Sequence, residues 1–407
     1  MNERTTSSHI ESTNLFEKEL EKPTIFKDES KLSINYIPSI LPHRENELKN
    51  LINEFRVIIE HPMKANRKVL ITGPVGTGKT AIAKSFGQML KSVAKKRNLN
   101  IYYHHVNCRR NRTYSLILKN IILSFYSAIP SRGYSPEELL DILKDILIKE
   151  KKYLVLTLDE LDYMVDKSPI LYDLTRLMDE EFNSDQYISL IIIARNTSFL
   201  HLLDKSTRST LQNPCITMKK YTAEQLFDIL AERCKEAFYS GTVSKEILEQ
   251  IAETSAEFGD ARYALELLRV AGGVANKECN LKISPEHVRI AQSNIHPMIK
   301  REILRDLTYN QKILLLAIVR KLKKEETVYV EISDVEDQYA IICEEFNFKA
   351  TQHTTNWNNI KDLETTFGII KTKVSGKNKR GRSTLISIND APLELLEEEL
   401  TQLLEQS

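Results

Sequence analysis

The chain has 407 residues, 42% of them hydrophobic and 28% charged, which is typical of a globular protein with two or three domains. Its 57 basic and 56 acidic side chains give a formal net charge of +1, so the total predicts no general attraction to nucleic acid. No apolar run approaches the ~18 residues that a membrane span needs, so no membrane partner is expected. The five cysteines are scattered without a CxxC pair, which favours reduced thiols over disulfides or a zinc site.

The N-terminal part has few ordering signals. Residues 1–25 carry acids and no apolar core, so they are interpreted as a disordered lead-in and neither a signal nor a transit peptide. Prolines 38 and 42 keep the next segment extended. Apolar residues then recur at helical spacing from Leu48 to Ile59.

A phosphate-binding loop follows the apolar run Val69–Ile71 and fits the pattern G-x-x-x-x-G-K-[ST]. A helical pattern comes directly after it, which completes the strand–loop–helix context that this motif requires. Backbone N–H groups and the helix dipole would bind phosphates, Lys79 would reach the β- and γ-phosphates, and the Thr80 hydroxyl would hold Mg²⁺. The residues expected to bind ATP or ADP here are Gly73, Pro74, Val75, Gly76, Thr77, Gly78, Lys79, Thr80 and Ala81.

A second nucleotide motif is predicted where the apolar strand Tyr153–Leu158 ends in Asp159 and Glu160. Asp159 would order Mg²⁺ through water, and Glu160 would orient the water that attacks the γ-phosphate. An acidic strand-to-helix turn without chemistry is the alternative, but it is less plausible about 80 residues after a phosphate-binding loop.

A third apolar run, Ile188–Ala194, ends beside Asn196. Asn196 could hydrogen-bond the γ-phosphate or the attacking water, although an asparagine here is more often a turn former. Strands that alternate with helices predict a parallel α/β sheet whose ligand lies at the carboxyl ends of the strands.

From about Asp204 to Asn294 the pattern is expected to be all-helical. Arg262 stands in the first turn of one of these helices, where a cation is unfavourable for the helix dipole. An anionic ligand would explain this arginine, and a surface salt bridge is the alternative.

The C-terminal part has the element order of a winged helix-turn-helix. A capping box at Thr308–Gln311 starts the apolar helix 313–322, residues 327–332 alternate like a strand, and helices follow at 334–345 and 353–367. Strands at 368–374 and 385–388 would form a hairpin, and residues 392–404 a final helix.

The tip of this hairpin holds the basic patch that the net charge conceals. Residues 371–382 contain six cations and no acid. We predict that this wing neutralises DNA phosphates, and that an arginine could enter the minor groove. The wing residues assigned to DNA are Lys377, Lys379, Arg380 and Arg382.

The preceding helix is interpreted as the recognition helix. Ile360, Leu363 and Phe367 would face the core, so the opposite side would present polar groups that suit base edges. Thr354, Thr355 and Asn358 are the residues assigned to this contact. A solvated helix beside a solvated loop is the alternative.

Taken together, these motifs resemble the archaeal origin-recognition initiators, the AAA+ family related to eukaryotic origin-recognition complex subunits and to the helicase-loading cell-division-cycle protein. The similarity runs over roughly Phe26 to Ile388. It is carried by YIP at 36–38, LPHRE at 41–45, GPVGTGKT at 73–80, LDELD at 158–162, YTAEQLFDIL at 221–230 and GDARYALELLR at 259–269.

The resemblance implies a RecA-like α/β AAA+ domain over 26–204, a helical lid over 205–296 and a winged-helix domain over 297–407. It also implies a slow ATPase that acts as a switch, with Asn196 as first sensor and Arg262 as second. The implied partners are double-stranded DNA at replication origins, the replicative helicase and paralogous initiators, in a cytoplasmic, nucleoid-associated protein. By the same analogy Pro42, His43 and Arg44 would lie near the adenine, Tyr221 would join the nucleotide site, and Arg132 would touch DNA.

Two departures from the family pattern stand out. Family members commonly read D-x-R-V-K-S-S-L after the first-sensor strand, and that arginine is proposed to act on a neighbour's nucleotide. Here Ser206 stands in its place and Arg208 in that of the lysine, so trans-activation is expected to be weak unless Arg208 substitutes. Family members often begin the recognition helix T-Q-R-R, whereas residues 351–354 read T-Q-H-T, which predicts weaker base readout.

Two other readings of the sequence stay open. A nucleotide-gated transcriptional regulator would use the same wing at promoters. A helicase loader or a viral or plasmid ATPase would lack origin specificity. Binding to repeats near a replication start would favour the initiator.

Overall fold

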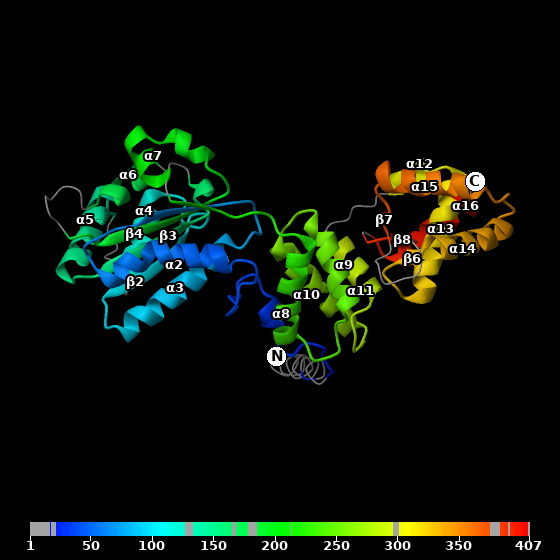
Figure 1. The fold of residues 1–407 in the computed structure, drawn as a ribbon, viewed down its shortest axis with the longest axis horizontal. Coiled ribbons are helices and arrows are strands. Elements are labelled where there is room, and N and C mark those ends of the chain that lie inside the picture. The colour runs from blue at the N-terminus through cyan, green and yellow to red at the C-terminus, as the bar shows by residue number, and fades with distance from the viewer. Residues whose placement is uncertain are drawn as a thin grey trace, which may run out of the picture. The chain divides into compact units, whose positions relative to one another are not determined.

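The computed structural model describes residues 17, 22–126, 133–164, 168–177, 185–212, 214–295, 301–374, 383–389 and 391–405 (Figure 1). The chain forms two compact units. One consists of Ile37–Gln225 with Phe258–Ala261, and the other holds the rest of the described chain.

The first unit is built on a five-stranded sheet in the order β2-β3-β4-β1-β5, and every described pairing in it is parallel. Its strands are β1 (Lys68–Thr72), β2 (Ile101–Asn107), β3 (Tyr153–Asp159), β4 (Ile188–Ala194) and β5 (Cys215–Thr217). Its helices are α2 (Glu45–Glu60), α3 (Lys79–Lys96), α4 (Tyr114–Leu123), α5 (Pro136–Lys149), α6 (Ser168–Arg176) and α7 (Lys205–Gln212), with short 3-10 turns η2 (Leu161–Tyr163) and η3 (Ser198–Leu202).

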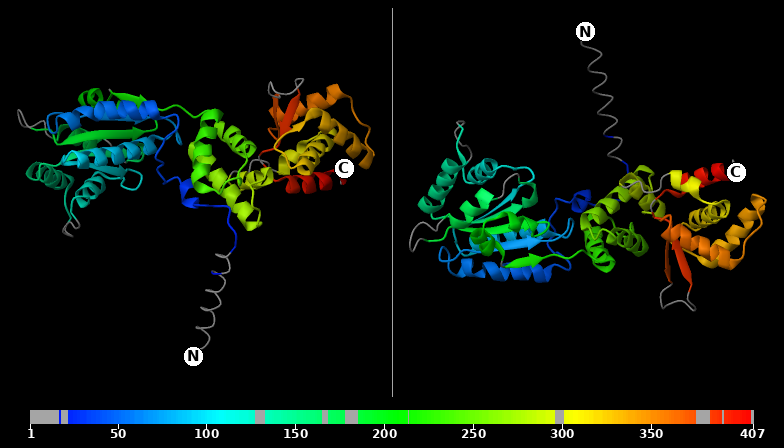
Figure 2. Two further views of the ribbon diagram at one scale, coloured as in Figure 1. Left: turned by 60° about the horizontal axis from the view of Figure 1, so that its bottom comes forward. Right: turned by 90° about the horizontal axis from the view of Figure 1, so that it is seen from above.

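Helices cover both faces of this sheet, as the two views in Figure 2 show. Strands β3 and β4 are buried along their whole length, which explains their continuous apolar sequence. Alternate residues serve opposite faces: Val155 packs with α2 and α3, whereas Leu154 and Leu156 pack with α4 and α5. The predicted parallel α/β sheet is confirmed.

Strand β5 differs from the sequence-based expectation. Residues 204–294 were expected to be all-helical, yet Cys215–Thr217 pairs with β1 and extends the main sheet. A three-residue strand is too short for a period of two to be recognised.

The second unit contains a helical part formed by α8 (Ala223–Ala237), α9 (Lys245–Ala256), α10 (Ala261–Lys277) and α11 (Pro285–Ile295). The segment around η1 (Glu29–Leu32) packs on it. Phe26 stacks on Phe238 with ring centroids 4.8 Å apart, and the Ile25 N–H donates to Asn276 Oδ1 at 2.9 Å.

A winged helix follows, with the order that the sequence predicts. Its elements are α12 (Arg301–Asp306), α13 (Tyr309–Glu325), β6 (Val330–Glu331), α14 (Ile332–Glu345), α15 (His353–Thr365), β7 (Lys371–Val374), β8 (Thr384–Ser387) and α16 (Leu393–Glu405). The antiparallel strands are ordered β6-β8-β7, and the predicted capping box at Thr308 and Gln311 is present. The alternating stretch 327–332 forms only a two-residue strand, because α14 begins at Ile332.

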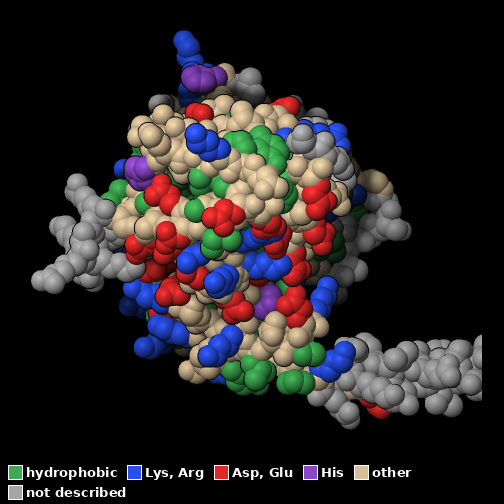
Figure 3. Space-filling model, turned by 90° about the vertical axis from the view of Figure 1, so that its right-hand side faces the viewer, with side chains coloured by type: hydrophobic (Ala, Val, Ile, Leu, Met, Phe, Trp, Pro, Cys, Tyr) green, Lys and Arg blue, Asp and Glu red, His purple; other side chains and the backbone are tan. Residues whose placement is uncertain are grey.

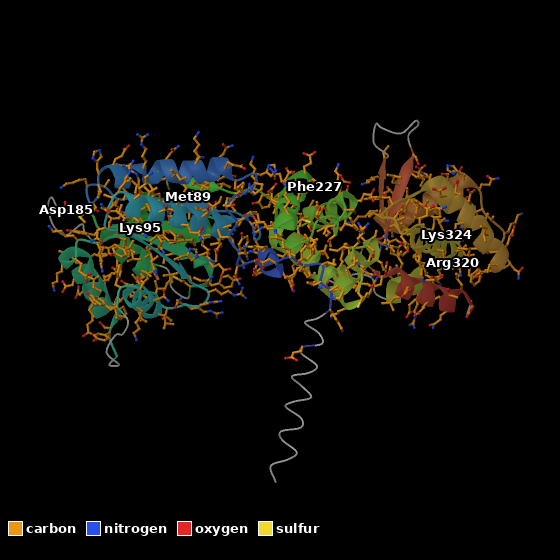
Figure 4. The ribbon with its side chains drawn as sticks, turned by 90° about the horizontal axis from the view of Figure 1, so that it is seen from below. Met89, Lys95, Asp185, Phe227, Arg320 and Lys324 are labelled. Carbon is orange, nitrogen blue, oxygen red and sulfur yellow. The ribbon has the colours of Figure 1, made fainter. Side chains whose placement is uncertain are left out.

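The end of this domain that Figure 3 shows has acidic and basic side chains interspersed. Arg320 of α13, labelled in Figure 4, pairs with Glu345 at 2.5 Å and with Glu397 at 3.1 Å, and so joins α13 to α14 and α16. No helix in the described part of the chain is long and apolar enough to cross a bilayer.

Candidate functional site

The phosphate-binding loop joins β1 to α3, as the motif predicts. Gly78 is the N-cap of α3 and has φ 91°, a left-handed conformation that favours glycine. The Gly73 N–H donates to the Arg195 carbonyl at 3.2 Å, so the loop starts against the end of β4. Lys79 Nζ donates to the carbonyls of Gly73 and Pro74 at 2.5 and 2.6 Å, which places its ammonium inside the curl of the loop.

Asp159 lies at the carboxyl end of β3 and is 1% exposed. Its Oδ2 accepts hydrogen bonds from Thr80 Oγ1 at 2.8 Å and from His105 Nε2 at 3.1 Å. Burial acts to raise the pKa of Asp159, but these hydrogen bonds outweigh it and the pKa lies below its ordinary value. The carboxylate is therefore ionised, and the structure brings together the two predicted metal residues.

The residues present fit a Mg²⁺ ion. Asp159 Oδ1 is buried without a hydrogen-bond partner among the described residues. The Thr80 hydroxyl donates its proton to Asp159 Oδ2, so the lone pairs of its oxygen can still bind a cation. Described residues contain no cluster of three His, Cys, Asp or Glu that would hold a metal alone. Mg²⁺ needs no such cluster, because it is usually bound by one or two protein oxygens together with substrate phosphates and water.

Glu160 is held by a residue that the sequence reading missed. The Asn107 amide, at the end of β2, donates to Glu160 Oε2 at 3.0 Å. Residues 107 and 159 are directly paired across β2 and β3. Only this strand register, between segments about 50 residues apart, brings Asn107 to the acid.

Arg44 lies at the phosphate loop, although its guanidinium is engaged within the protein. It donates to the Thr77 carbonyl at 3.0 Å and to the Lys219 carbonyl at 2.7 Å, and it lies 4.0 Å from the centre of the Tyr221 ring. Arg44 is only 4% exposed. Its bonds to Thr77 and Lys219 connect the phosphate loop to the segment after β5. The adenine contacts predicted for Pro42, His43, Arg44 and Tyr221 stay predictions.

The residues at the start of α10 also contact the phosphate loop. The Ala261 N–H donates to the Gly76 carbonyl at 3.2 Å. A Cβ at Gly76 would stand 1.7 Å from Asp260 Oδ1, so only glycine allows this approach. Arg262 follows directly and has an exposed side chain; its role as second sensor stays a prediction.

Asn196 follows β4, and its side-chain oxygen accepts from the Ser198 N–H at 2.9 Å. It thus forms a turn at the start of η3, which was the alternative to a sensor role. The sensor role of Asn196 stays a prediction, supported by the bond between the Arg195 carbonyl and Gly73.

Arg208 is bonded within its own domain. Its guanidinium donates to the carbonyls of Leu200 at 2.9 Å and Leu203 at 3.2 Å. Ser206, at the place of the family's arginine, accepts a hydrogen bond from Arg176 at 2.5 Å. A finger role for Arg208 would require these carbonyl contacts to break, and it stays a prediction.

On α15 the predicted polar face is exposed. Thr354, Thr355 and Asn358 are exposed, whereas Ile360 and Leu363 are fully buried. Arg132, Lys377, Lys379, Arg380 and Arg382 lie outside the described residues.

The base of the wing contacts the helical part of the same unit. Lys371 pairs with Glu257 at 2.6 Å, and Lys373 pairs with Glu253 at 2.9 Å. Tyr329 joins the contact, because its ring lies 3.7 Å from Lys373 Nζ and its hydroxyl donates to Glu253. These two lysines are called the wing-base lysines below.

A parallel sheet with this loop after β1, an acid pair at the end of β3, a following helical lid and a C-terminal winged helix defines a nucleotide-binding protein of the AAA+ class. The chain matches an AAA domain over residues 63–203, a Cdc6 AAA+ ATPase-type lid domain over 227–293, and a CDC6 C-terminal winged helix domain over 302–398. Nucleotide hydrolysis is the activity that this class implies.

The chain is similar to ORC1-type DNA replication protein 2 of Sulfurisphaera tokodaii, with 36% identity over 389 residues and 93% of each chain covered. It is 32% identical over 387 residues to the ORC1-type DNA replication protein of Thermococcus kodakarensis, with 93% of this chain and 92% of the relative covered. The chain therefore belongs to the ORC1-type (Cdc6) family of DNA replication proteins, which confirms the resemblance seen in the sequence.

Solved structures agree with this assignment. The crystal structure of Cdc6p from Pyrobaculum aerophilum matches with a TM-score of 0.83 and 31% identity, covering 94% of this chain and 99% of that one. The ORC1 protein of Aeropyrum pernix, solved in complex with DNA, matches with a TM-score of 0.61 and 26% identity over 94% of this chain and 98% of that one.

Proposed function

We propose that this protein is an ATP/ADP-switched initiator that recognises replication-origin repeats in double-stranded DNA and helps to load the replicative helicase. The proposal is supported by the presence, in one chain of the ORC1-type family, of a phosphate-binding loop whose Thr80 bonds Asp159 and of a winged helix with an exposed polar helix face. Paralogous initiators on the same origin are further proposed partners.

At the nucleotide site the loop N–H groups bind the phosphates, and Lys79 leaves the carbonyls of Gly73 and Pro74 to pair with them. Thr80 and Asp159 would hold Mg²⁺, which neutralises phosphate charge when bound. Glu160 orients the attacking water, and its carboxylate must first leave or reorient on Asn107. That requirement supports a slow ATPase that works as a switch.

At the DNA site we propose that the wing neutralises phosphates and that the exposed face of α15 reads base edges. The ORC1 protein of Aeropyrum pernix was solved in complex with DNA, and its shared fold supports this use of the winged helix. The polar face has threonine and asparagine in place of arginine, so we expect the wing to supply most of the affinity.

The test is fluorescence anisotropy with the full chain on duplex DNA from a replication start of its own genome, with ATP, ADP or no nucleotide. We expect tighter binding to origin DNA than to scrambled DNA, and a nucleotide dependence that Lys79→Ala abolishes. Equal affinity for both DNAs would contradict origin recognition, and selective binding to a promoter would favour a transcriptional regulator. Helicase loading is tested separately, by pull-down with the replicative helicase.

A further inference from the structure

Strand β2 supplies polar side chains to both acids of the neighbouring strand. Residues 103, 105 and 107 turn to the same face because strand side chains alternate. His105 binds Asp159, and Asn107 binds Glu160. Each acid of the pair therefore has its own partner, and His105 belongs to none of the nucleotide motifs in the sequence.

The bond between His105 and Asp159 has a defined direction. An ionised carboxylate only accepts hydrogen bonds, so Nε2 carries the proton and donates to Oδ2 at 3.1 Å. The Thr80 hydroxyl donates to the same oxygen. Two donors on Oδ2 fix the rotation of the carboxyl group and leave the buried Oδ1 as its unpaired oxygen among the described residues.

The imidazole ring lies beside a tyrosine that is anchored to α3. Tyr103 Oη lies 3.3 Å from His105 Nδ1, and the Tyr103 hydroxyl donates to the Ala83 carbonyl in α3 at 2.7 Å. Thr157 of β3 donates to the same hydroxyl at 3.0 Å. Tyr103 packs against Gly87, where a Cβ would stand 2.2 Å from its ring. His105 therefore lies beside a tyrosine that is fixed against the helix following the phosphate loop, and its own hydrogen bond is the one from Nε2 to Asp159.

We propose that His105 is a positioning residue for the Mg²⁺ side of the nucleotide site. It fixes the orientation of the Asp159 carboxylate through Oδ2, and it would act on a bound ion only through Asp159. The proposal rests on the nucleotide and Mg²⁺ binding proposed above. Partners that orient a metal-associated carboxylate commonly change metal affinity about tenfold or more when removed.

The experiment measures binding of a fluorescent, non-hydrolysable ATP analogue to the full chain, first in EDTA and then as Mg²⁺ is added. His105→Leu removes the donor and keeps the bulk, whereas His105→Gln keeps a donor nitrogen at similar reach. His105→Phe is a second donor-free variant in case the leucine variant does not fold. His104→Leu is the matched control, because His104 is the preceding residue of β2 and bonds Asn120 at 2.9 Å.

We expect His105→Leu and His105→Phe to raise the Mg²⁺ concentration at half-effect about tenfold, with the affinity in EDTA unchanged. His105→Gln and His104→Leu should stay within about twofold of the parent. Equal weakening with and without Mg²⁺, or the same shift in the leucine and glutamine variants, would overturn the positioning role. A parent protein that binds no nucleotide would instead refute the proposed function.

Discussion

The buried Arg289 gives the sharpest test of how the winged helix is joined to the helical part. This residue of α11 is 1% exposed and donates to the Ile388 carbonyl at 2.8 Å and to the Thr327 carbonyl at 3.1 Å. Its partner Glu286, 3.2 Å away, also accepts from the Leu393 N–H at 2.8 Å. We predict that Arg289→Met destabilises the winged-helix domain because both carbonyls lose their charged donor.

The magnitude follows from these contacts. Each hydrogen bond from a charged donor contributes about 1.5–3 kcal/mol. Burial lowers the pKa of Arg289, which shows that desolvation of the guanidinium offsets part of this gain. We take the net loss in free energy of unfolding as about 3 kcal/mol. With a urea dependence of about 2 kcal/mol per molar, the midpoint of urea unfolding should fall by about 1.5 M.

The chain provides a selective probe for this measurement. Its single tryptophan, Trp357, lies in α15, so urea titration followed by tryptophan emission reports the winged-helix domain alone. Arg305→Met is the matched control, because Arg305 is an exposed arginine of α12 in the same domain. The reasoning would be refuted if the urea midpoint of Arg289→Met differed from that of the parent protein by no more than the midpoint of Arg305→Met does.

Three further predictions concern function. Asn107→Ala frees the Glu160 carboxylate from the bond that it must otherwise leave, so we expect single-turnover ATP hydrolysis to rise about three- to tenfold with unchanged ADP affinity; an unchanged rate would show that the bond does not restrain the acid. Glu253→Gln with Glu257→Gln releases the wing-base lysines, so DNA binding should tighten. The slope of the logarithm of the DNA-binding constant against the logarithm of the salt concentration should become more negative by up to about 0.9 per lysine. Glu232→Gln with Glu246→Gln changes the charge equally elsewhere and should leave that slope unchanged. Arg208→Ala tests the finger hypothesis: hydrolysis at the parent rate at high protein concentration would exclude it.

The sequence predicted the features that a continuous segment encodes. The phosphate loop, the strand that ends in Asp159 and the helix–hairpin order of the winged helix each carry their own pattern of glycines, acids or apolar period. Their positions agree with the structure because local periodicity and turn chemistry determine them.

Contacts that depend on pairing between distant segments could not be predicted in this way. Asn107 and His105 reach the acids only through the register of β2 on β3. Asp260 reaches Gly76 across about 180 residues of chain, and Lys373 meets Glu253 across 120. Arg44 was assigned to the adenine by analogy, yet its donors are directed at backbone carbonyls and Glu47, which no sequence pattern indicates.

The most direct test of the initiator role is genome-wide crosslinking and sequencing of the bound DNA. The parent protein should be compared with a variant in which Lys377, Lys379, Arg380 and Arg382 are changed to alanine. We predict sharp peaks at replication starts for the parent and their loss in the variant. Peaks confined to promoters, or a uniform weak signal in both proteins, would contradict an origin-binding initiator.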